Sequence, residues 1–458
     1  MVVDVAIQTS NLTLTAGDGQ RVTVPANNRI EVRFPAAAED VGTARFRAAA
    51  VSGDPESGFA DAATIALPVY TPATSEAFAT YGVVDGTGTT AVGQTIVAPE
   101  DVFPQFGGLE VNTSSTALQS LTDAILYLSE YRYQSSDGYA SRILAISALR
   151  DVLDAFDADG LPEPAELNAT VAADIEALFQ LQTNNGGFAA WATIRGSSPY
   201  HSVYATHALV EARDNGYAVN EQKLASALQH LANIEDFYPN QYYDQEVLPV
   251  LSAYALHVRA QAGNRDVAKA TDLYRRSADE LGLDGLAWIW PVIDDAGIRA
   301  EIEREFQNRA AETAGAATFA SDYGEDGYLI LHSSRRTDGL ILDALISEAP
   351  DSDLIPKVVA GLLGGQTRGR WNNAQENSFI LLALNHYFDT FESVDPDFVA
   401  RVWLGDLYAA EHTYEGRTTD RNLTLVPMAE LLEQTGDADR TDLVVSKTGE
   451  GRLYYRLG

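Results

Sequence analysis

The chain has 458 residues, and its 65 Asp and Glu residues outnumber its 31 Lys and Arg residues, which gives a formal net charge of −34. This excess of negative charge argues against a nucleic-acid-binding surface, which needs clustered Lys and Arg, and against adhesion to an anionic membrane. Cysteine is absent, so disulfides, cysteine-ligated zinc, iron–sulfur clusters and thiol nucleophiles are excluded.

The first part of the chain, up to about residue 100, predicts β-structure. Residues 1–10 lack a basic segment followed by an apolar run, so we expect no signal segment in this chain. Short stretches of alternating polar and apolar residues follow, separated by Gly-, Asn- and Pro-rich turns. This pattern predicts antiparallel strands at 2–7, 12–15, 21–24, 29–34, 44–50 and 62–70.

The period of the apolar residues changes to 3.6 from about residue 113, which predicts helices up to about residue 391. Alternation then returns at 397–404 and in the final segment, 441–458. No run of apolar residues approaches the length of a membrane-spanning helix. The predicted order is therefore β-structure, a large helical block, and β-structure again.

The helical block contains an internal repeat of about 45 residues. Each repeat has an aromatic, Gly- or Asn-rich turn followed by a helix with one small or apolar face. A single helical hairpin cannot bury its apolar face, so neighbouring hairpins must stack. About six hairpins that close on themselves would form an α/α toroid, and an open superhelix is the alternative. The repeated turns lie at 184–188, 236–240, 284–288, 326–328 and 369–373.

Candidate catalytic residues are few. The histidines include no i, i+4 pair with an intervening acid, so we predict no metal site and no cofactor. Asp322, Glu325 and Asp326 share one turn and suggest a carbohydrate-active enzyme that uses paired carboxylates, although clusters of acids also arise by chance in so acidic a chain. Aromatic residues of the repeat turns either line a ligand cavity or plug the helical barrel: Phe188, Trp191, Trp288, Trp290 and Trp371.

Lysine is scarce, with four residues in the whole chain. A surface that is rich in acids and poor in lysine stays hydrated at high salt, where charge repulsion is screened. We therefore interpret the negative charge as a halophilic-type surface and not as a site for a cationic partner.

Several short motifs follow one another along the chain. Residues 103–109 read FPQFGGL, and residues 182–191 read QTNNGGFAAW, with a Gly-Gly-Phe-x-x-Trp turn. In number and order, these motifs resemble the C-terminal region of bacterial alpha-2-macroglobulins, and the resemblance covers essentially the whole chain. Further matching segments lie at 114–116, 131–142, 198–209, 369–384, 403–406 and 451–458.

The resemblance implies a multidomain fold of α and β parts. Residues 1–69 would form part of a macroglobulin-like β-domain, and residues 106–391 a thioester-type α/α toroid. Residues 70–105 and 392–458 would pair as a split CUB-like β-sandwich into which the toroid is inserted. The macroglobulin-like array and the bait region that peptidases cut would lie outside this sequence, so we expect the chain to be a piece of a longer protein.

The same resemblance locates a four-residue window at Ser135, Ser136, Asp137 and Gly138. Thioester-bearing members have Cys-x-Glu-Gln there, and the Cys sulfur joins the Gln acyl carbon to give an electrophile that captures peptidases. Ser135 stands at the Cys position and Gly138 at the Gln position. Because glycine has no side-chain acyl group, neither a thioester nor an oxygen ester can form between them. The loss of several positions favours natural degeneration over a single engineered change.

The function implied is that of a bacterial alpha-2-macroglobulin-like, broad-spectrum endopeptidase inhibitor that traps peptidases non-covalently, and not an enzyme. Its partners would be peptidases, bound through the full-length protein, and its location the periplasm or the cell surface. Two alternatives stay open at this point. One is the carbohydrate-active enzyme described above, and the other is a protein-binding module for a cell-envelope partner such as a cell-wall-synthesis protein.

Overall fold

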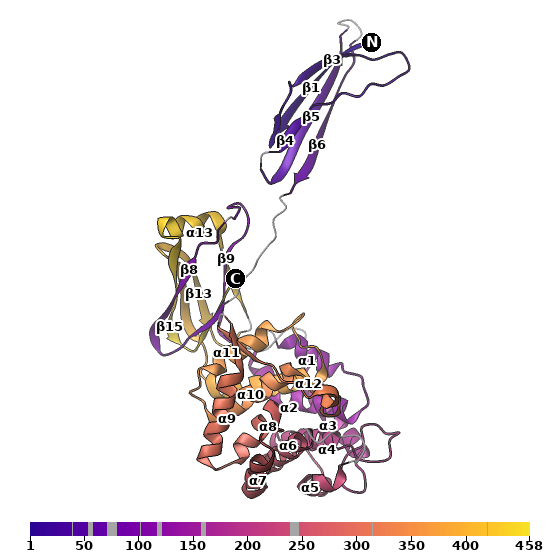
Figure 1. Cartoon of the computed structure of the whole chain (residues 1–458), viewed down its shortest axis with the longest axis vertical. Helices are drawn as coiled ribbons and strands as arrows, with labels where there is room; N and C mark the ends of the chain where they lie inside the picture. The colour runs from indigo at the N-terminus through magenta and orange to yellow at the C-terminus, as the bar shows by residue number, and fades with distance from the viewer. Residues whose placement is uncertain are drawn as a thin grey trace. The chain divides into compact units, whose positions relative to one another are not determined.

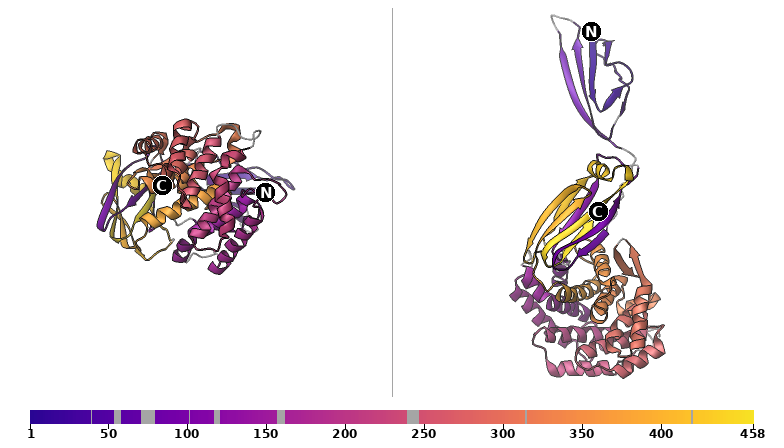
Figure 2. Two further views of the ribbon diagram at one scale, coloured as in Figure 1. Left: turned by 90° about the horizontal axis from the view of Figure 1, so that it is seen from below. Right: turned by 90° about the vertical axis from the view of Figure 1, so that its left-hand side faces the viewer.

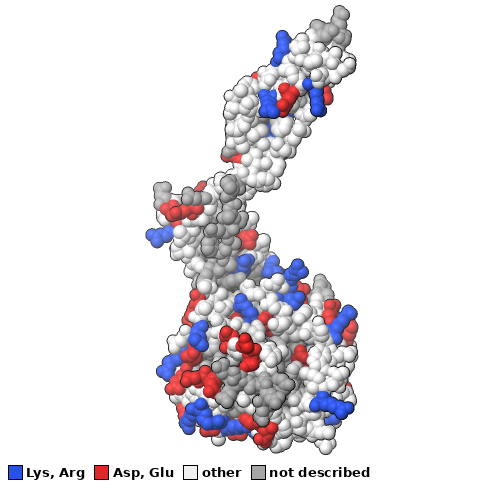
Figure 3. All heavy atoms as spheres, turned by 45° about the vertical axis from the view of Figure 1, so that its right-hand side comes forward, with Lys and Arg blue, Asp and Glu red and all other residues white. Residues whose placement is uncertain are grey.

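A computed structural model describes residues 1–458 except 39, 54–57, 71–79, 101, 117–120, 157–161, 239–246, 314 and 419. The chain divides into two compact units, Met1–Ala77 and Phe78–Gly458 (Figure 1). In the described part of the chain, no helix is both long and apolar enough to cross a membrane. On the face that Figure 3 shows, acidic side chains are scattered over the helical part with basic ones between them.

The first unit contains a four-stranded antiparallel sheet with the strand order β3-β1-β5-β6 and a two-stranded sheet of β2 and β4. The predicted strand at 29–34 is wrong: these residues join no ladder, and the next strand covers three alanines further along. Gln20 Nε2 donates to the Arg33 carbonyl at 2.6 Å, so a side chain takes the place of a partner strand there. The strands are β1 (Val2–Ser10), β2 (Leu12–Leu14), β3 (Gly19–Thr23), β4 (Ala36–Ala38), β5 (Gly42–Ser52) and β6 (Ala60–Val69).

Little of this first sheet is buried. Among its described residues, only Ala44 and Ser52 are buried, whereas Ile65 and Leu67 on β6 are about half exposed. A sheet normally buries one face against a second layer, which supplies most of its stability. The first unit by itself therefore has almost no hydrophobic core.

The second unit contains a two-sheet sandwich built from both ends of its sequence. The sheet orders are β13-β12-β15-β8 and β14-β9-β16-β7, so early strands lie between or beside late ones (Figure 2). Val111, Phe398, Leu443 and Leu453 come from both segments and fill one core. The strands are β7 (Thr80–Val84), β8 (Gly88–Val97), β9 (Gly108–Ser114), β12 (Asp397–Leu404), β13 (Leu407–Glu415), β14 (Asn422–Pro427), β15 (Arg440–Glu450) and β16 (Leu453–Leu457).

The helical domain is inserted between β9 and β12. Its even-numbered helices contact one another in the closed order α2, α4, α6, α8, α10, α12 and back to α2. This closure confirms the predicted toroid over an open superhelix. The helices are α1 (Thr122–Ser129), α2 (Ser136–Phe156), α3 (Pro164–Gln180), α4 (Pro199–Asp214), α5 (Glu221–Ala232), α6 (Val247–Gln261), α7 (Val267–Ser277), α8 (Gly282–Ile289), α9 (Ala296–Arg309), α10 (Ser334–Glu348), α11 (Leu354–Gly364) and α12 (Ala374–Phe391).

Shorter elements complete the unit. A hairpin of β10 and β11 packs against α11, and α13 closes one end of the sandwich beside β9, β14 and β15. Part of the predicted turn at 236–240 lies outside the described residues, because Pro239 and Asn240 are among the gaps. The bounds are β10 (Ala310–Thr313), β11 (Ala316–Phe319), α13 (Met428–Thr435) and the 3-10 helices Ile234–Phe237, Trp290–Val292, Gly324–Ile330 and Gly436–Ala438.

The centre of the toroid holds a fully buried ion pair. The Arg336 guanidinium on α10 bonds to the Asp284 carboxylate on α8 and donates to the Tyr200 hydroxyl on α4 at 3.1 Å. Thr337 donates to the other carboxylate oxygen of Asp284. Burial alone would raise the pKa of Asp284, but the charge of Arg336 and the hydrogen bonds to the carboxylate outweigh it and lower this pKa to about 2.

Aromatic rings surround this pair. The Arg336 guanidinium lies 5.6 to 5.8 Å from the ring centres of Tyr200, Trp288 and Phe379. Trp288 also stacks on Tyr254, with ring centres 4.0 Å apart and planes 12° apart. Of the turn aromatics named from the sequence, Trp288 thus plugs the barrel, and Phe188, Trp290 and Trp371 are also buried. Trp191 alone among these five is exposed.

The central ion pair can be tested by substituting Asp284→Asn. Removal of one partner leaves the Arg336 charge buried without compensation, which typically costs about 3–5 kcal/mol. We therefore expect urea or thermal unfolding of D284N to show a loss of that order. The matched control is Asp272→Asn, which removes an exposed pair with Arg276 on α7 and should change stability by less than about 1 kcal/mol. Equal effects of the two substitutions would contradict a central role for the pair.

Candidate functional site

The four-residue window named from the sequence lies at the start of α2, which begins at Ser136. Ser135 precedes the helix and acts as its cap: its hydroxyl accepts from the Gly138 amide at 3.2 Å, and its carbonyl accepts from the Tyr139 amide at 3.0 Å. The Ser136 amide donates to the Ala190 carbonyl at 3.0 Å. The helix start is thereby attached to the loop that carries the Gly-Gly-Phe turn.

Gly138 occupies a place that admits no side chain. A Cβ atom built on it would lie 2.4 Å from the Tyr133 carbonyl oxygen and 3.1 Å from the Ser135 hydroxyl. Real Cβ atoms do not approach other atoms so closely, so any larger residue would displace the backbone at Tyr133. In this conformation, position 138 has neither a side chain nor the space for one.

Two buried interactions hold the segment before the window. Arg142 on α2 forms a two-pronged ion pair with Asp174 on α3, with nitrogen–oxygen distances of 2.7 and 2.6 Å. The same guanidinium also donates to the Tyr131 carbonyl. Such forked pairs fix geometry as well as adding energy. Arg142 therefore anchors the turn that carries Tyr133 over Gly138.

The side chains of the window offer no reactive group. Ser135 and Ser136 are each 1% exposed, and the Ser135 hydroxyl is already engaged at the helix cap. Asp137 lies 3.8 Å from His201, whose pKa is lowered by burial and raised in part by Asp137. Because the chain contains no cysteine, it cannot form a thioester.

The carboxylates proposed for a carbohydrate-active enzyme lie on the outside. Asp322 and Glu325 are exposed and Asp326 is partly exposed, in and beside the 3-10 helix Gly324–Ile330. Asp322 accepts from the Gly324 amide at 2.9 Å, which is a local turn interaction. A glycosidase needs two carboxyl groups that face each other across a sugar-binding pocket. Their positions on one surface turn do not provide that arrangement.

Three of the histidines are buried, namely His207, His230 and His257. His207 on α4 bonds to the Tyr254 hydroxyl at 2.8 Å, and burial, with a smaller effect of His257, lowers its pKa to about 3. Within the described residues, no group of three or more His, Asp and Glu side chains is arranged to hold a metal ion.

A partly exposed carboxylate lies beside these histidines. Glu211 on α4 has an oxygen 3.8 Å from His207 Nε2. Its pKa is raised to about 7, first by burial and then by the charges of Asp343 and Asp214, while His386 acts in the opposite direction. Asp343 and His386 bond to each other at 2.8 Å across α10 and α12. Glu211 therefore keeps its proton to a higher pH in the folded protein than in the unfolded chain.

Three features of the site were not found from the sequence. The Ser135 cap could have been found, because serine is a preferred residue before a helix. The closure over Gly138 depends on the backbone path at Tyr133 in the preceding turn, and the pairing of Arg142 with Asp174 spans 32 residues. Neither leaves a local pattern in the sequence.

Comparison with solved structures identifies the architecture. The native alpha-2-macroglobulin of Escherichia coli, from domain MG7 to the C-terminus, superposes with a TM-score of 0.53 at 20% identity, covering 100% of this chain and 68% of that one. The E. coli protein activated by porcine elastase gives 0.57 at 19% identity, covering 100% and 39%. Salmonella alpha-2-macroglobulin reacted with methylamine gives 0.53 at 19% identity, covering 100% and 28%. The fold is that of this C-terminal region.

Curated sequences also match. An alpha-2-macroglobulin homolog of Nostoc is 24% identical over 432 residues, which cover 92% of this chain and 22% of that protein. Circularly permutated Ras protein 2 of Dictyostelium discoideum is 26% identical over 388 residues, covering 80% of this chain and 10% of that protein. The chain thus spans less than a quarter of either relative. No protein-family model matches the chain.

The steric closure at Gly138 predicts that a substitution there destabilises the protein. Alanine is the better helix former, so Gly138→Ala in α2 would ordinarily stabilise the protein. Because the added Cβ meets the Tyr133 carbonyl, we expect a loss of about 1–3 kcal/mol instead. The control is Gly93→Ala in β8, where nothing lies within 4 Å of an added Cβ; its stability should stay the same or rise by up to about 1 kcal/mol. A stabilised G138A protein would refute the closure.

The raised pKa of Glu211 predicts that the stability of the protein depends on pH. A carboxyl group whose pKa is raised in the folded state contributes stability that is present below its unfolded pKa and is lost as the pH rises through the folded pKa. The free energy of unfolding should therefore fall between about pH 4.5 and pH 7, by about 1–3 kcal/mol from this group. Glu211→Gln should remove that part, so the variant should gain on the wild type at pH 8 relative to pH 5. Parallel pH curves for the two proteins would contradict the assignment.

Proposed function

We propose that this chain, which is homologous in fold and sequence to the C-terminal region of bacterial alpha-2-macroglobulin, serves as that region of an endopeptidase inhibitor that works without covalent capture. The observation that carries the proposal is a sequence match along almost the whole chain, combined with the absence of cysteine. The degenerate window, Ser135, Ser136, Asp137 and Gly138, stands where thioester-bearing members carry their electrophile.

The proposed division of the chain follows the same relatives. Residues 1–69 would be part of a macroglobulin-like domain, and the near absence of a core in that unit supports the idea that further layers complete it. Residues 70–105 and 392–458 would be the CUB-like sandwich, and residues 106–391 the thioester-type domain. The ladders that join β8 to β15 and β16 to β7 support this pairing of distant segments. β9 pairs with β14 and β16, so Gly108–Ser114 also belong to the sandwich, and the helical part begins after them.

In this proposal, the toroid has a mechanical function. A thioester-bearing domain supplies an electrophile, whereas this one has a capped helix start and a window that is closed by the Tyr133 carbonyl. Captured peptidases would then be held by enclosure alone. The buried ion pairs Arg336–Asp284 and Arg142–Asp174 support the role of a stiff body that moves or packs as one piece.

Peptidases are the proposed partners, bound through the longer protein, and a periplasmic or cell-surface location in a bacterium is proposed with them. The E. coli relative has been solved both activated by porcine elastase and activated by trypsin. Inhibition of several peptidases of different specificity by the full-length protein would support the broad-spectrum function.

Methylamine provides a direct test of the non-covalent mechanism. It opens thioesters and leaves a covalent adduct on the Gln acyl carbon, and the Salmonella relative has been solved after reaction with it. We expect intact-mass and peptide-mass measurements to show no adduct at residues 135–138 of this chain, with the Salmonella protein as the positive control. An adduct there would refute the proposal.

The double variant Ser135→Cys, Gly138→Gln extends this test. If this chain lacked only the Cys and Gln side chains of thioester-bearing members, the variant would react with methylamine. Because the backbone leaves no room for a Cβ at position 138, we expect no adduct and a lower unfolding midpoint instead. Restored reactivity would show that the window keeps the reactive geometry.

A further inference from the structure

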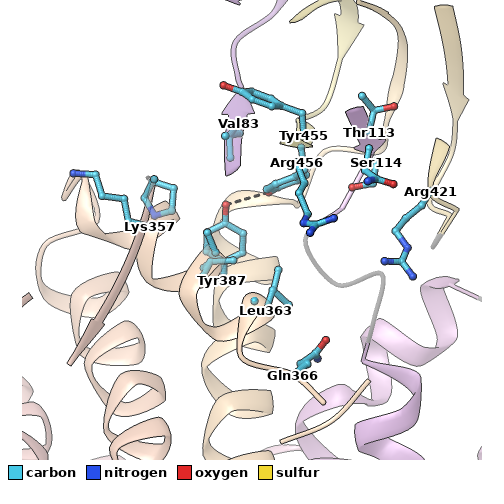
Figure 4. A pocket seen from close by; sticks show the side chains of 18 of the residues that line it. Val83, Thr113, Ser114, Lys357, Leu363, Gln366, Tyr387, Arg421, Tyr455 and Arg456 are labelled. Atoms are coloured by element: carbon cyan, nitrogen blue, oxygen red, sulfur yellow. Dashed lines mark hydrogen bonds between the residues drawn. The ribbon is translucent and has the colours of Figure 1, made fainter. Parts of the chain in front are cut away.

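A cavity of about 760 Å³ lies within the second unit, between the sandwich and the helical domain (Figure 4). One wall is the outer face of the sheet β14-β9-β16-β7, and the other is α11 with one side chain of α12. Binding pockets for organic ligands have volumes of about 300–1,000 Å³ and often lie between domains. The size and place of this cavity therefore fit a ligand site.

The register of β16 explains which side chains face the cavity. Leu453 and Leu457 are buried in the sandwich core. Because successive side chains of a strand point to opposite faces, Tyr454 and Arg456 are directed to the outer face. Tyr454 bonds to the Tyr387 hydroxyl of α12 at 3.1 Å, which joins the two walls at this point.

Part of the cavity is apolar. Pro356, Val359, Ala360 and Leu363 line it from α11, and Leu423 lines it from β14. Leu423 is 59% exposed, although it lies in a strand with a core-facing side. Exposed leucine beside a helix with an apolar wall forms a surface on which apolar side chains of a partner can be buried.

One end of the cavity is cationic. Figure 4 shows the guanidinium groups of Arg421 and Arg456 turned toward the same space above Gln366. Arg421 is exposed and joins none of the ion pairs found among the described residues. At the other end, Lys357 is bound by Glu312 at 2.7 Å and Asp353 at 3.1 Å, so its charge is compensated.

Because the guanidinium groups of Arg421 and Arg456 face the same part of the cavity, positive charge is concentrated there. Arginine binds carboxylates with two parallel hydrogen bonds, which makes such a pair suited to an acidic side chain or a terminal carboxylate. Glu110 also lines the cavity, on the strand next to Arg456, and its charge reduces the local potential. The chain as a whole carries a charge of −34, so this convergence of cations is a local exception.

We propose that this cavity binds an acidic peptide segment, whose carboxylate lies on Arg421 and Arg456 and whose apolar side chains lie on Leu423 and α11. A peptide fits better than an inorganic anion, because an inorganic anion would leave the apolar wall exposed. The proposal goes beyond the proposed function and does not depend on it, because it needs no peptidase and no bait cleavage.

Isothermal titration of the protein with acetyl-Leu-Glu-Leu-Glu-amide tests the site. We expect saturable binding with one site per chain, which weakens as salt is raised. The matched peptide acetyl-Leu-Gln-Leu-Gln-amide, which lacks the carboxylates, should bind about fivefold more weakly or worse. The absence of saturable heat up to about 1 mM peptide, or equal affinity for the two peptides, would overturn the proposal.

Variants identify the place of binding. R421Q and R456Q should each weaken the acidic peptide about fivefold or more and leave the Gln peptide unaffected. Both side chains are exposed, so neither variant should lower the unfolding midpoint. R440Q, at an exposed arginine on β15 outside the cavity, is the matched control and should bind as the wild type does. Unchanged affinity in both R421Q and R456Q would overturn the assignment, whatever the methylamine experiment gives.

Discussion

The buried pair of Arg336 and Asp284 is the constraint on which the toroid depends. It joins α10 to α8 directly and to α4 through the Tyr200 hydroxyl, and aromatic rings from α4, α8 and α12 surround the guanidinium. A closed ring of helices leaves a central axis that must be filled. Here it is filled by a charge pair enclosed by rings, and burial of one charge without the other would cost several kcal/mol. The pair therefore favours the single arrangement in which the facing helices meet.

A second buried ion pair, between Arg142 and Asp174, holds the window at the start of α2. Arg142 fixes the preceding turn to α3 through Asp174, and that turn carries the Tyr133 carbonyl over Gly138. In the proposed function, this helix start stands where thioester-bearing relatives present an electrophile, and it carries a cap made by Ser135 instead. Under that proposal, the fold of the domain is kept, and the Tyr133 backbone occupies the space beside Gly138. Such a combination suits a protein that encloses its target without bonding to it.

Much of the fold could be predicted from the sequence, because it depends on periodicity. The change from a period of two to 3.6 near residue 113, and its reversal near residue 397, marked the inserted helical domain. Closure of the ring could not be predicted in the same way, since it rests on the contact between α12 and α2. The Arg336–Asp284 pair spans 52 residues in a chain with 65 acids, so no local pattern singles it out. The strand predicted at 29–34 does not form. Alternating polar and apolar residues make a strand only where the backbone pairs with a neighbouring strand, and these residues pair with none.

We propose that the longer protein holds peptidases without a covalent bond. The most direct measurement is a denaturing gel, with mass spectrometry of each band, after the full-length protein has been incubated with trypsin and inhibition of large substrates has been verified. We expect all trypsin to migrate at its free mass, because denaturation opens the enclosure and no thioester is available to capture a lysine. A band that contains both proteins, joined through residues 135–138, would contradict it.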